Sequence, residues 1–253
     1  MSFQLIIVCA LIFLAGFIDA IAGGGGLISL PAYFFAGLPT HNALATNKFS
    51  AACGTTVATL TFFQKKAMHL NIAFVSALTS FAASYLGSKL ALHIDEQVLK
   101  IIIIILLPVV ALFLFFKKDF GNITPAEQSL SDAKAYRLAA IIGLLIGFYD
   151  GLFGPGTGTF AIIAYSSLMK DDLVTASGNA KVLNLASNYA SLIAYLFSGK
   201  IIFSLGIPAA VCGIAGNWLG SSLAIKKGNR LIKVMMLIVL VLLFAKIIFD
   251  IVK

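Results

Sequence analysis

Charged residues are scarce in this sequence. Asp, Glu, Lys and Arg make up 11% of the 253 residues, whereas 60% are hydrophobic and the mean hydropathy is +1.02. A typical soluble domain carries about 25% charged residues, which cover its surface. The shortage therefore excludes an ordinary soluble domain and predicts a chain embedded in a lipid bilayer.

Cysteine and histidine are also rare, with three of each. The cysteines lie in apolar stretches without a CxxC pair, and we interpret them as small apolar residues. The histidines fall near expected loop ends without the spacing of metal ligands. The sequence has no phosphate-binding Gly-Lys-Ser/Thr loop, and no nucleophile, base and orienting group stand together. We therefore expect no metal, no cofactor and no enzyme activity.

Long hydrophobic runs are what the sequence has instead. A membrane-crossing helix needs about 20 predominantly apolar residues. The runs span residues 3–37, 42–63, 70–92, 98–116, 138–168, 174–198, 201–225 and 231–250. They predict an all-α, polytopic membrane helix bundle of about eight hydrophobic segments. The first run has no basic segment before it and continues into more apolar sequence, so we interpret it as a retained helix and not as a cleaved signal peptide.

The net charge of +8 does not predict nucleic-acid binding. The basic residues sit in short segments between hydrophobic runs and not on one continuous face. Lysine and arginine in such segments usually mark the cytoplasmic ends of membrane helices. We therefore expect the lipid bilayer, and no nucleic acid, as the partner of this chain.

The sequence repeats itself at an offset of 131–133 residues. GFIDAIAGGGG at 16–26 matches GFYDGLFGPGT at 147–157, and LGSKLA at 86–91 matches LGSSLA at 219–224. Between them, ATNK at 45–48 resembles ASGNAK at 176–181. These matches predict two homologous halves, residues 1–117 and 138–253, joined by a polar linker at 118–137.

The basic residues also predict how the halves lie in the membrane. The linker, the pair Lys65 and Lys66, and the cluster at 226–233 would all prefer the cytoplasm. Placing all three there requires an odd number of crossings per half, which gives the halves opposite orientations. Such inverted repeats are common in secondary transporters. A parallel arrangement with four spans per half remains open.

Each half has a glycine-rich run in its first hydrophobic segment. Residues 22–26 read AGGGG and residues 154–158 read GPGTG, and neither can continue as a stable helix. A broken helix presents the free N–H groups and partial positive charge of a new N-terminus, which suit an anion. Matched breaks in two halves are the best sequence pointer to a transporter's binding site. Close helix packing through small residues is the alternative interpretation.

Asp19 and Asp150 occupy equivalent positions shortly before the two glycine runs. Ionisable residues inside a membrane are costly and are functional candidates. We therefore consider both as proton-coupling residues. In the alternative interpretation each carboxylate caps the broken helix or pairs with a nearby lysine, and the two interpretations can hold together.

Lys48 and Lys181 are also equivalent, and polar residues follow both. Spacings of three and four place such residues on one face of a helix. The polar positions are Ser177, Lys181, Asn184, Asn188, Ser191 and Tyr195 in the second half, and Lys48, Thr55 and Thr59, with Asn47 alongside, in the first. They predict a translocation path in which lysine attracts an anion and amides replace its water. Hydrogen bonding between helices is the alternative.

The segments 16–48 and 147–181 resemble the paired signature of the TauE/SafE family of sulfite exporters and related membrane permeases. The resemblance extends over nearly the whole chain. It implies a multi-pass protein of the cytoplasmic (inner) membrane that carries a small inorganic or organic sulfur anion. The family pattern and the polar stripe together give these candidate anion-binding residues: Gly24, Gly25, Gly26, Asn47, Lys48, Gly156, Thr157, Gly158, Asn179, Lys181 and Asn184.

We hypothesise a secondary transporter that moves this anion by alternating access, with Asp19 or Asp150 coupling a proton. Thr157 stands where the first half has Gly26, so we expect an asymmetric site. An anion channel or a carrier of a different small organic anion is the alternative, and a membrane-embedded enzyme or a non-transporting subunit is a further competitor. A homodimer is left open.

Overall fold

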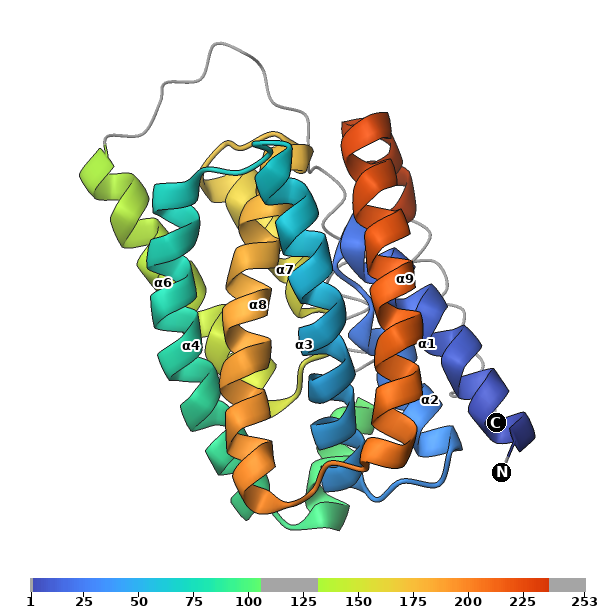
Figure 1. Ribbon diagram of the computed structural model, residues 1–253. Helices are drawn as coiled ribbons and strands as arrows, with labels where there is room; N and C mark the ends of the chain where they lie inside the picture. Colours follow the sequence, from blue (N-terminus) through green and yellow to red (C-terminus); the bar gives the residue numbers. More distant parts are fainter. Residues whose placement is uncertain (1, 106–131, 237–253) are drawn as a thin grey trace.

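The computed structural model describes residues 2–105 and 132–236, which form helices and no strands. The all-α prediction is therefore confirmed for these residues. In chain order the helices are α1 (Ser2–Ala22), α2 (Gly26–Phe35), α3 (Thr40–Gln64), α4 (Leu70–His93), α6 (Asp132–Leu152), α7 (Thr157–Leu168), α8 (Leu173–Ser198) and α9 (Phe203–Lys227) (Figure 1). Residues 96–105 and 229–236 are also helical.

Several predicted boundaries lie at or beyond the edge of the described residues. The hydrophobic segments expected at 98–116 and 231–250 extend into ranges outside them, as does most of the expected linker at 118–137. The last part of that linker, residues 132–137, forms the first turns of α6. Its charged and polar residues begin a helix because Asp132 stands in the first turn, where a negative charge suits the helix dipole.

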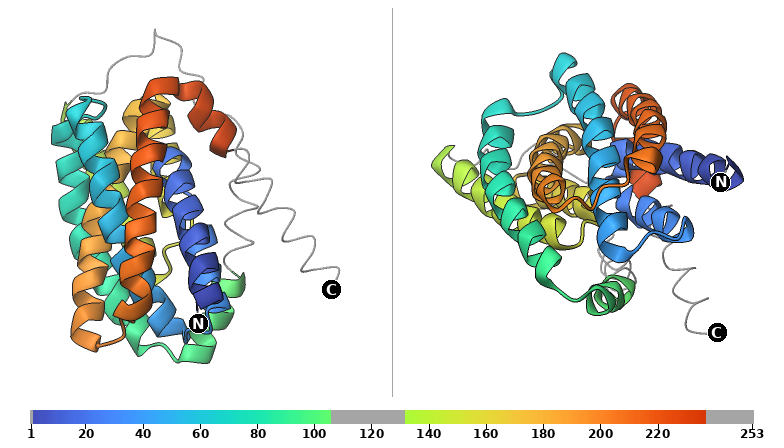
Figure 2. Two further views of the ribbon diagram at one scale, coloured as in Figure 1. Left: turned by 45° about the vertical axis from the view of Figure 1, so that its right-hand side comes forward. Right: turned by 60° about the horizontal axis from the view of Figure 1, so that its bottom comes forward.

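Within residues 2–105 and 132–236, four helices are long and apolar enough to cross a membrane, namely α1, α4, α6 and α9. Helices α3 and α8, with 25 and 26 residues, bury polar side chains and lie between the α1–α9 and α4–α6 pairs (Figure 2). Large apolar side chains such as Phe81, Val211 and Trp218 are exposed on the outer helices. Apolar outside and polar inside is the arrangement expected of a protein whose surroundings are lipid.

Both glycine runs interrupt helices. Gly23 (φ +76°) and Gly154 (φ +89°) adopt the left-handed backbone conformation, which glycine tolerates and other residues rarely do. The two breaks touch each other, because a Cβ atom added to Gly23 would lie 2.1 Å from the carbonyl carbon of Gly158. Thr159 also donates its backbone N–H to the Gly23 carbonyl at 3.2 Å. The α1–α2 and α6–α7 turns therefore meet within the bundle.

The outer helices pack in parallel pairs through small residues. Along α4 and α6, Ser80 faces Gly147 and Ser84 faces Gly151, so the contacts advance in the same direction on both helices. Along α1 and α9, Gly216 likewise meets Phe13. Missing side chains at such glycines let two backbones approach closely, which is how helices associate in lipid.

Helices α3 and α8 run in opposite directions. At the start of α3, Thr46 accepts a hydrogen bond from the Ile202 N–H, just after the end of α8 (3.1 Å). At the start of α8, Asn179 accepts one from the His69 N–H, just after the end of α3 (2.8 Å). Both helices also contact the segments before the breaks, since Lys48 on α3 pairs with Asp150 and Lys181 on α8 pairs with Asp19.

Candidate functional site

A cavity lies where the two breaks meet α3, α8 and α9. About 60 Å³ of it is open to water. Since one water molecule needs roughly 10–15 Å³ on this measure, the space suits a few waters or one small anion. Its polar and glycine lining comprises Gly16, Asp19, Gly23, Gly25, Gly26, Ser29, Asn47, Lys48, Ser50, Thr55, Asp150, Gly154, Gly158, Asn184, Asn188, Gly213 and Asn217.

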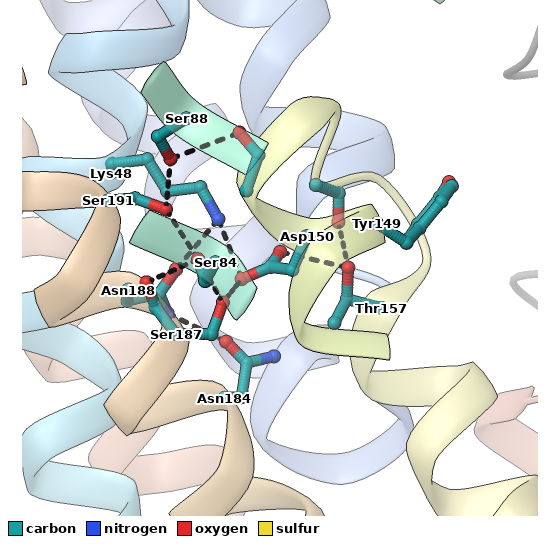
Figure 3. Close-up of polar contacts among 12 residues, drawn as sticks. Lys48, Ser84, Ser88, Tyr149, Asp150, Thr157, Asn184, Ser187, Asn188 and Ser191 are labelled. Carbon is teal, nitrogen blue, oxygen red and sulfur yellow. Dashed lines mark hydrogen bonds and ion pairs between the residues drawn. The ribbon is translucent and has the colours of Figure 1, made fainter. Parts of the chain in front are cut away.

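Asp150 is the more enclosed of the two intramembrane aspartates. Its Oδ2 atom lies 2.7 Å from Lys48 Nζ, and both side chains are only 3% exposed. The Thr157 hydroxyl donates to the other carboxylate oxygen at 2.9 Å, and the Ser187 hydroxyl donates to Oδ2 (Figure 3). Lys48 also donates to Asn188 Oδ1 at 3.2 Å. The carboxylate is thus held by one ammonium and two hydroxyls.

Asp19 has a different set of donors. Lys181 Nζ lies 2.6 Å from Asp19 Oδ2 and also donates to the Asp19 backbone carbonyl at 2.6 Å. The Gly25 N–H, at the start of the second part of the broken helix, donates to Oδ1 at 3.2 Å. Asp19 lines the cavity and is 15% exposed, whereas Lys181 is 1% exposed.

The two ion pairs are crossed between the halves. Lys48 of the first half binds Asp150 of the second, and Lys181 of the second binds Asp19 of the first. With lysines protonated and aspartates ionised, the four charges sum to zero. Buried charges are tolerated when paired and become strongly destabilising when one partner is removed. In this state, therefore, both lysine charges are directed at carboxylates and not at a ligand.

Amide and hydroxyl groups cover the wall of the cavity beside Lys48. Asn188 donates to Thr55 Oγ1 at 3.2 Å and to Asn184 Oδ1 at 2.7 Å. These residues belong to the polar stripes predicted on α3 and α8. Asn47, also predicted, lines the cavity on the same side. The group offers both donors and acceptors to a small polar ligand.

Asn217 on α9 lines the cavity and was not singled out from the sequence. Its side chain fits beside two glycines, because a Cβ atom on Gly16 or Gly54 would lie 2.7 or 2.4 Å from Asn217 Nδ2. A signal was available: the repeat offset makes Asn217 the counterpart of Ser84, so a polar residue recurs at this helix position. Ser29 and Ser50 were missed because single serines are common in membrane helices.

Five predicted site residues lie outside the cavity lining: Gly24, Gly156, Thr157, Asn179 and Lys181. Thr157 and Lys181 nevertheless hold the aspartates that line it. Asn179 is farther away, because its amide donates to Asp171 Oδ2 at 2.8 Å while its oxygen accepts from His69. It joins the loop before α8 to the loop after α3.

Asp171 lies in the loop between α7 and α8, beyond the membrane-crossing helices. Burial raises the pKa of its carboxyl group from 3.8 to about 6, although the nearby His69 and the Asn179 amide act in the opposite direction. His69 Nδ1 lies 3.3 Å from Asp171 Oδ1. Within residues 2–105 and 132–236, no three His, Cys, Asp or Glu side chains gather as metal ligands would.

The chain is similar to known proteins along most of its length. The family model described as "Sulfite exporter TauE/SafE" matches residues 8–247. The probable membrane transporter protein YfcA of Escherichia coli (strain K12) is 36% identical over 94% of this chain and 87% of its own length. A probable membrane transporter protein of Haemophilus influenzae is 36% identical over 94% and 92%. No solved structure matches the chain significantly.

Proposed function

Because the chain belongs to the TauE/SafE family of sulfite exporters, a family of membrane transporters and not of enzymes, we propose that it carries a small sulfur-containing anion of the sulfite or organosulfonate type across the cytoplasmic membrane. The observation that carries this proposal is the pair of crossed ion pairs at a small cavity between two helix breaks. The names of the two relatives cited above support transport but do not specify the transported substrate, which has to be tested.

Charge balance argues that the anion travels with a proton. The site is neutral when both ion pairs are intact, so an anion alone would add an uncompensated charge to a buried, low-dielectric place. If Asp150 takes up a proton, its hold on Lys48 weakens and Lys48 can bind the anion. Lys48 and Asp150 both line the cavity, so proton and anion would occupy one site together.

Neutral groups complete the anion site in this proposal. The N-termini of α2 and α7 begin at the cavity, where their N–H groups and partial positive charge favour an anion. Asn184 supplies an amide donor from α8. The space suits one oxyanion head group stripped of most of its water.

Alternating access would follow from inverted repeats. Supporting this, the parallel packing of α4 on α6 has a counterpart in that of α9 on α1, at positions related by the repeat offset: Ser80 and Gly147 correspond to Gly213 and Gly16. Each ion pair links one repeat to the other, so a rocking motion would separate one pair at a time. The basic residues after α3 and at the end of α9 favour the cytoplasm at that end.

The first experiment is uptake of labelled sulfite into liposomes that contain the purified protein, with thiosulfate, sulfate and a small sulfonate as competitors. Saturable uptake with counterflow supports a carrier, whereas linear flux without counterflow indicates a channel. A pH gradient should drive accumulation. If folded protein moves none of these anions, the sulfur-anion proposal is wrong.

Variants of the ion pair sharpen this experiment. Lys48→Gln should abolish uptake, because it removes the positive charge from the cavity wall. Lys100→Gln is the matched control, since Lys100 is exposed and distant in sequence from both helix breaks. Uptake by Lys48→Gln at the wild-type rate would contradict the lysine's role.

A further inference from the structure

Four buried serines connect Asp150 to the C-terminal part of α4 through one continuous series of hydrogen bonds. The Ser187 hydroxyl donates either to Asp150 Oδ2 or to Ser84 Oγ, the latter at 3.0 Å. Ser84 and Ser191 are 2.9 Å apart, and Ser88 donates to Ser191 at 2.8 Å. All four serines are fully buried. The series alternates between α8 and α4 beside the Lys48–Asp150 pair (Figure 3).

These hydroxyls can be arranged in more than one way. A serine hydroxyl has a single proton to donate and two lone pairs that accept. Ser84 can donate to the Ser187 carbonyl at 2.9 Å or to a neighbouring hydroxyl, and Ser88 can donate to the Gly151 carbonyl at 3.1 Å or to Ser191. Passing a proton toward Asp150 requires Ser187 to donate to Asp150 and the Ser84 hydroxyl to turn toward Ser187, which in the present arrangement donates to Ser84. After the transfer Ser187 again donates to Ser84, and turning the hydroxyls resets the series for the next proton.

Helix α8 carries another buried hydroxyl on the face that bears Ser187 and Ser191. Tyr195 follows Ser191 by one turn on the same face of α8, and among the described residues its fully buried hydroxyl has no hydrogen-bond partner. Buried polar groups are almost always satisfied by protein or ordered water. Ser88 stands five residues before the exposed His93, which is about 7.5 Å along the helix axis. Water would have to bridge that distance for the series to reach the end of α4.

The first half shows that packing does not require these hydroxyls. At the repeat offset, Ser187, Ser191 and Tyr195 correspond to Gly54, Ala58 and Phe62. The α3–α9 contact thus lacks the hydroxyls that α8 supplies to the α4–α8 contact. Serines placed only to join helices would leave this difference unexplained.

We propose that Ser88, Ser191, Ser84 and Ser187 form a proton relay between Asp150 and water at the α4 C-terminal end of the bundle. Inward, a hydronium ion gives a proton to Ser88, and each hydroxyl passes its own proton to the next. Ser187 gives its proton to Asp150 Oδ2. One proton enters, one carboxyl group forms, and each serine ends with one proton. The relay rests on the proposed proton-linked transport.

The groups that face Asp150 agree with this role. Lys48 faces it from α3, and Asp19 with Lys181 lies on the other side of the cavity lining. Ser187 reaches Asp150 Oδ2 from α8, and Lys48 reaches the same oxygen from α3. Ser187 does not line the cavity, so a proton delivered through it neutralises the carboxylate without passing through the space that the anion occupies.

The test compares Ser191→Ala with Ser80→Ala. Ser80 lies on the same face of α4, is equally buried and contacts α8 through the Leu183 carbonyl, but it is not part of the series. Accumulation driven by a pH gradient should fall about 100-fold or more in Ser191→Ala, in line with the worth of a positioned proton-transfer group. Ser191 belongs to the polar stripe predicted from the sequence but does not line the cavity. Counterflow at equal pH should therefore stay within about twofold of wild type, and Ser191→Thr should restore accumulation.

The outcomes separate the relay from the transport function. Absence of sulfur-anion counterflow in the wild-type protein would overturn the proposed function. Wild-type counterflow without any response to a pH gradient would overturn the relay alone. Equal accumulation by Ser191→Ala, Ser80→Ala and wild type would also overturn the relay and leave the carrier standing. Thermal melting of each variant in detergent confirms that only folded protein is compared.

Discussion

The two aspartate–lysine pairs are equivalent in sequence and differ in their surroundings. Asp150 receives hydroxyls from Thr157 and Ser187 in addition to Lys48. The corresponding positions around Asp19 are Gly26 and Gly54, which have no side chain to offer. Asp19 is held instead by Lys181 and the Gly25 N–H.

Under the proposed function, this difference would give the two equivalent aspartates separate roles. On the Asp150 side, hydroxyl groups enclose the carboxylate and connect it to the proposed proton relay. Glycines on the Asp19 side leave room, since Gly26 lines the cavity and Gly54 accommodates the Asn217 side chain. The variants below test whether the two sides contribute in these separate ways, from the largest expected effect to the smallest.

Gly23→Ala should be the most damaging single change, with a loss of more than about 4 kcal/mol of folding free energy. Its Cβ atom would lie 2.1 Å from the Gly158 carbonyl carbon and 2.3 Å from the Thr159 nitrogen. These are backbone atoms, which cannot move aside as a flexible side chain can. A Cβ atom on the repeat counterpart Gly154 would make only ordinary van der Waals contacts, the nearest at 3.5 Å with Asp150 Oδ1, so Gly154→Ala should lose only about 1–2 kcal/mol from its positive φ. Yield and thermal melting in detergent measure both.

Gly37→Ala controls for backbone strain alone. Gly37 also has a positive φ (+81°) and nothing within 4 Å of an added Cβ atom. Its loss should resemble that of Gly154→Ala. If Gly23→Ala behaved like these two variants, close contact between the helix breaks would not be what holds the site together.

Asp150→Asn should destabilise more than Asp19→Asn. The first change leaves Lys48 charged and 3% exposed, a situation that typically costs about 3–5 kcal/mol. Lys48 retains a hydrogen bond of 3.2 Å to Asn188 after the first change, whereas Lys181 retains one of 2.6 Å to the Asp19 backbone carbonyl after the second, so the loss there should be smaller. Thermal melting compares the pair, and adding Lys48→Gln to Asp150→Asn should recover part of the loss. Equal losses for the two single variants would remove the distinction between the two sides.

Gly54→Ser gives the first half the hydroxyl that the second half has at Ser187. The added Cβ atom would lie 2.4 Å from Asn217 Nδ2, so the Asn217 side chain must move, and this side chain lines the cavity. Overpacking of this kind costs about 1–3 kcal/mol. We expect KM for the anion to rise several-fold with little change in proton response. Asn217→Ala in the same chain should relieve the crowding, and additive effects in this double-mutant cycle would contradict a shared space.

The smallest effect concerns the ends of α3 and α8. Asn179 and Thr46 make equivalent end contacts, but only Asn179 also binds a titratable residue, Asp171. Because burial raises the pKa of Asp171 from 3.8 to about 6, the folded state binds its proton more tightly than the unfolded chain. The resulting stability is complete below pH 4 and is lost as the pH rises through about 6.

Melting curves between pH 4 and pH 7 test this assignment. The wild-type midpoint should fall with rising pH in this window relative to that of Asp171→Asn, which has no carboxyl group to titrate. The difference between the two proteins should be flat above pH 7. A constant difference throughout the window would show that Asp171 titrates as it does in the unfolded chain.

Much of the architecture could be predicted because its signals are local. Hydropathy gave the helices, and the glycine runs gave both breaks. The equivalence of Asp19 with Asp150, and of Lys48 with Lys181, followed from the repeat offset. An interpretation in which each carboxylate pairs with a lysine was also open at that point, but the offset says which residues correspond and not which ones touch.

The predicted binding residues also differ in whether a local signal placed them correctly at the cavity. Asn184 had the helical spacing that brings it to the cavity, and Asn179 had a family motif but lies at the helix end, bound to the Asp171 loop. Asn217 carried no local signal beyond its repeat counterpart, because its position depends on glycines in two other helices. Helical periodicity therefore predicted which face of a helix a residue occupies better than how deep in the membrane that residue lies.

The sequence by itself determined the membrane class, the duplication, the two broken helices and the four charged residues, since each of these depends on residues that are near one another in the chain. Only the tertiary structure decided that each lysine pairs with the aspartate of the other half, and that the space lies on the glycine side. Those outcomes depend on how helices more than 100 residues apart in sequence pack together. Packing of that kind is set by side-chain volumes at contacts that no local pattern describes.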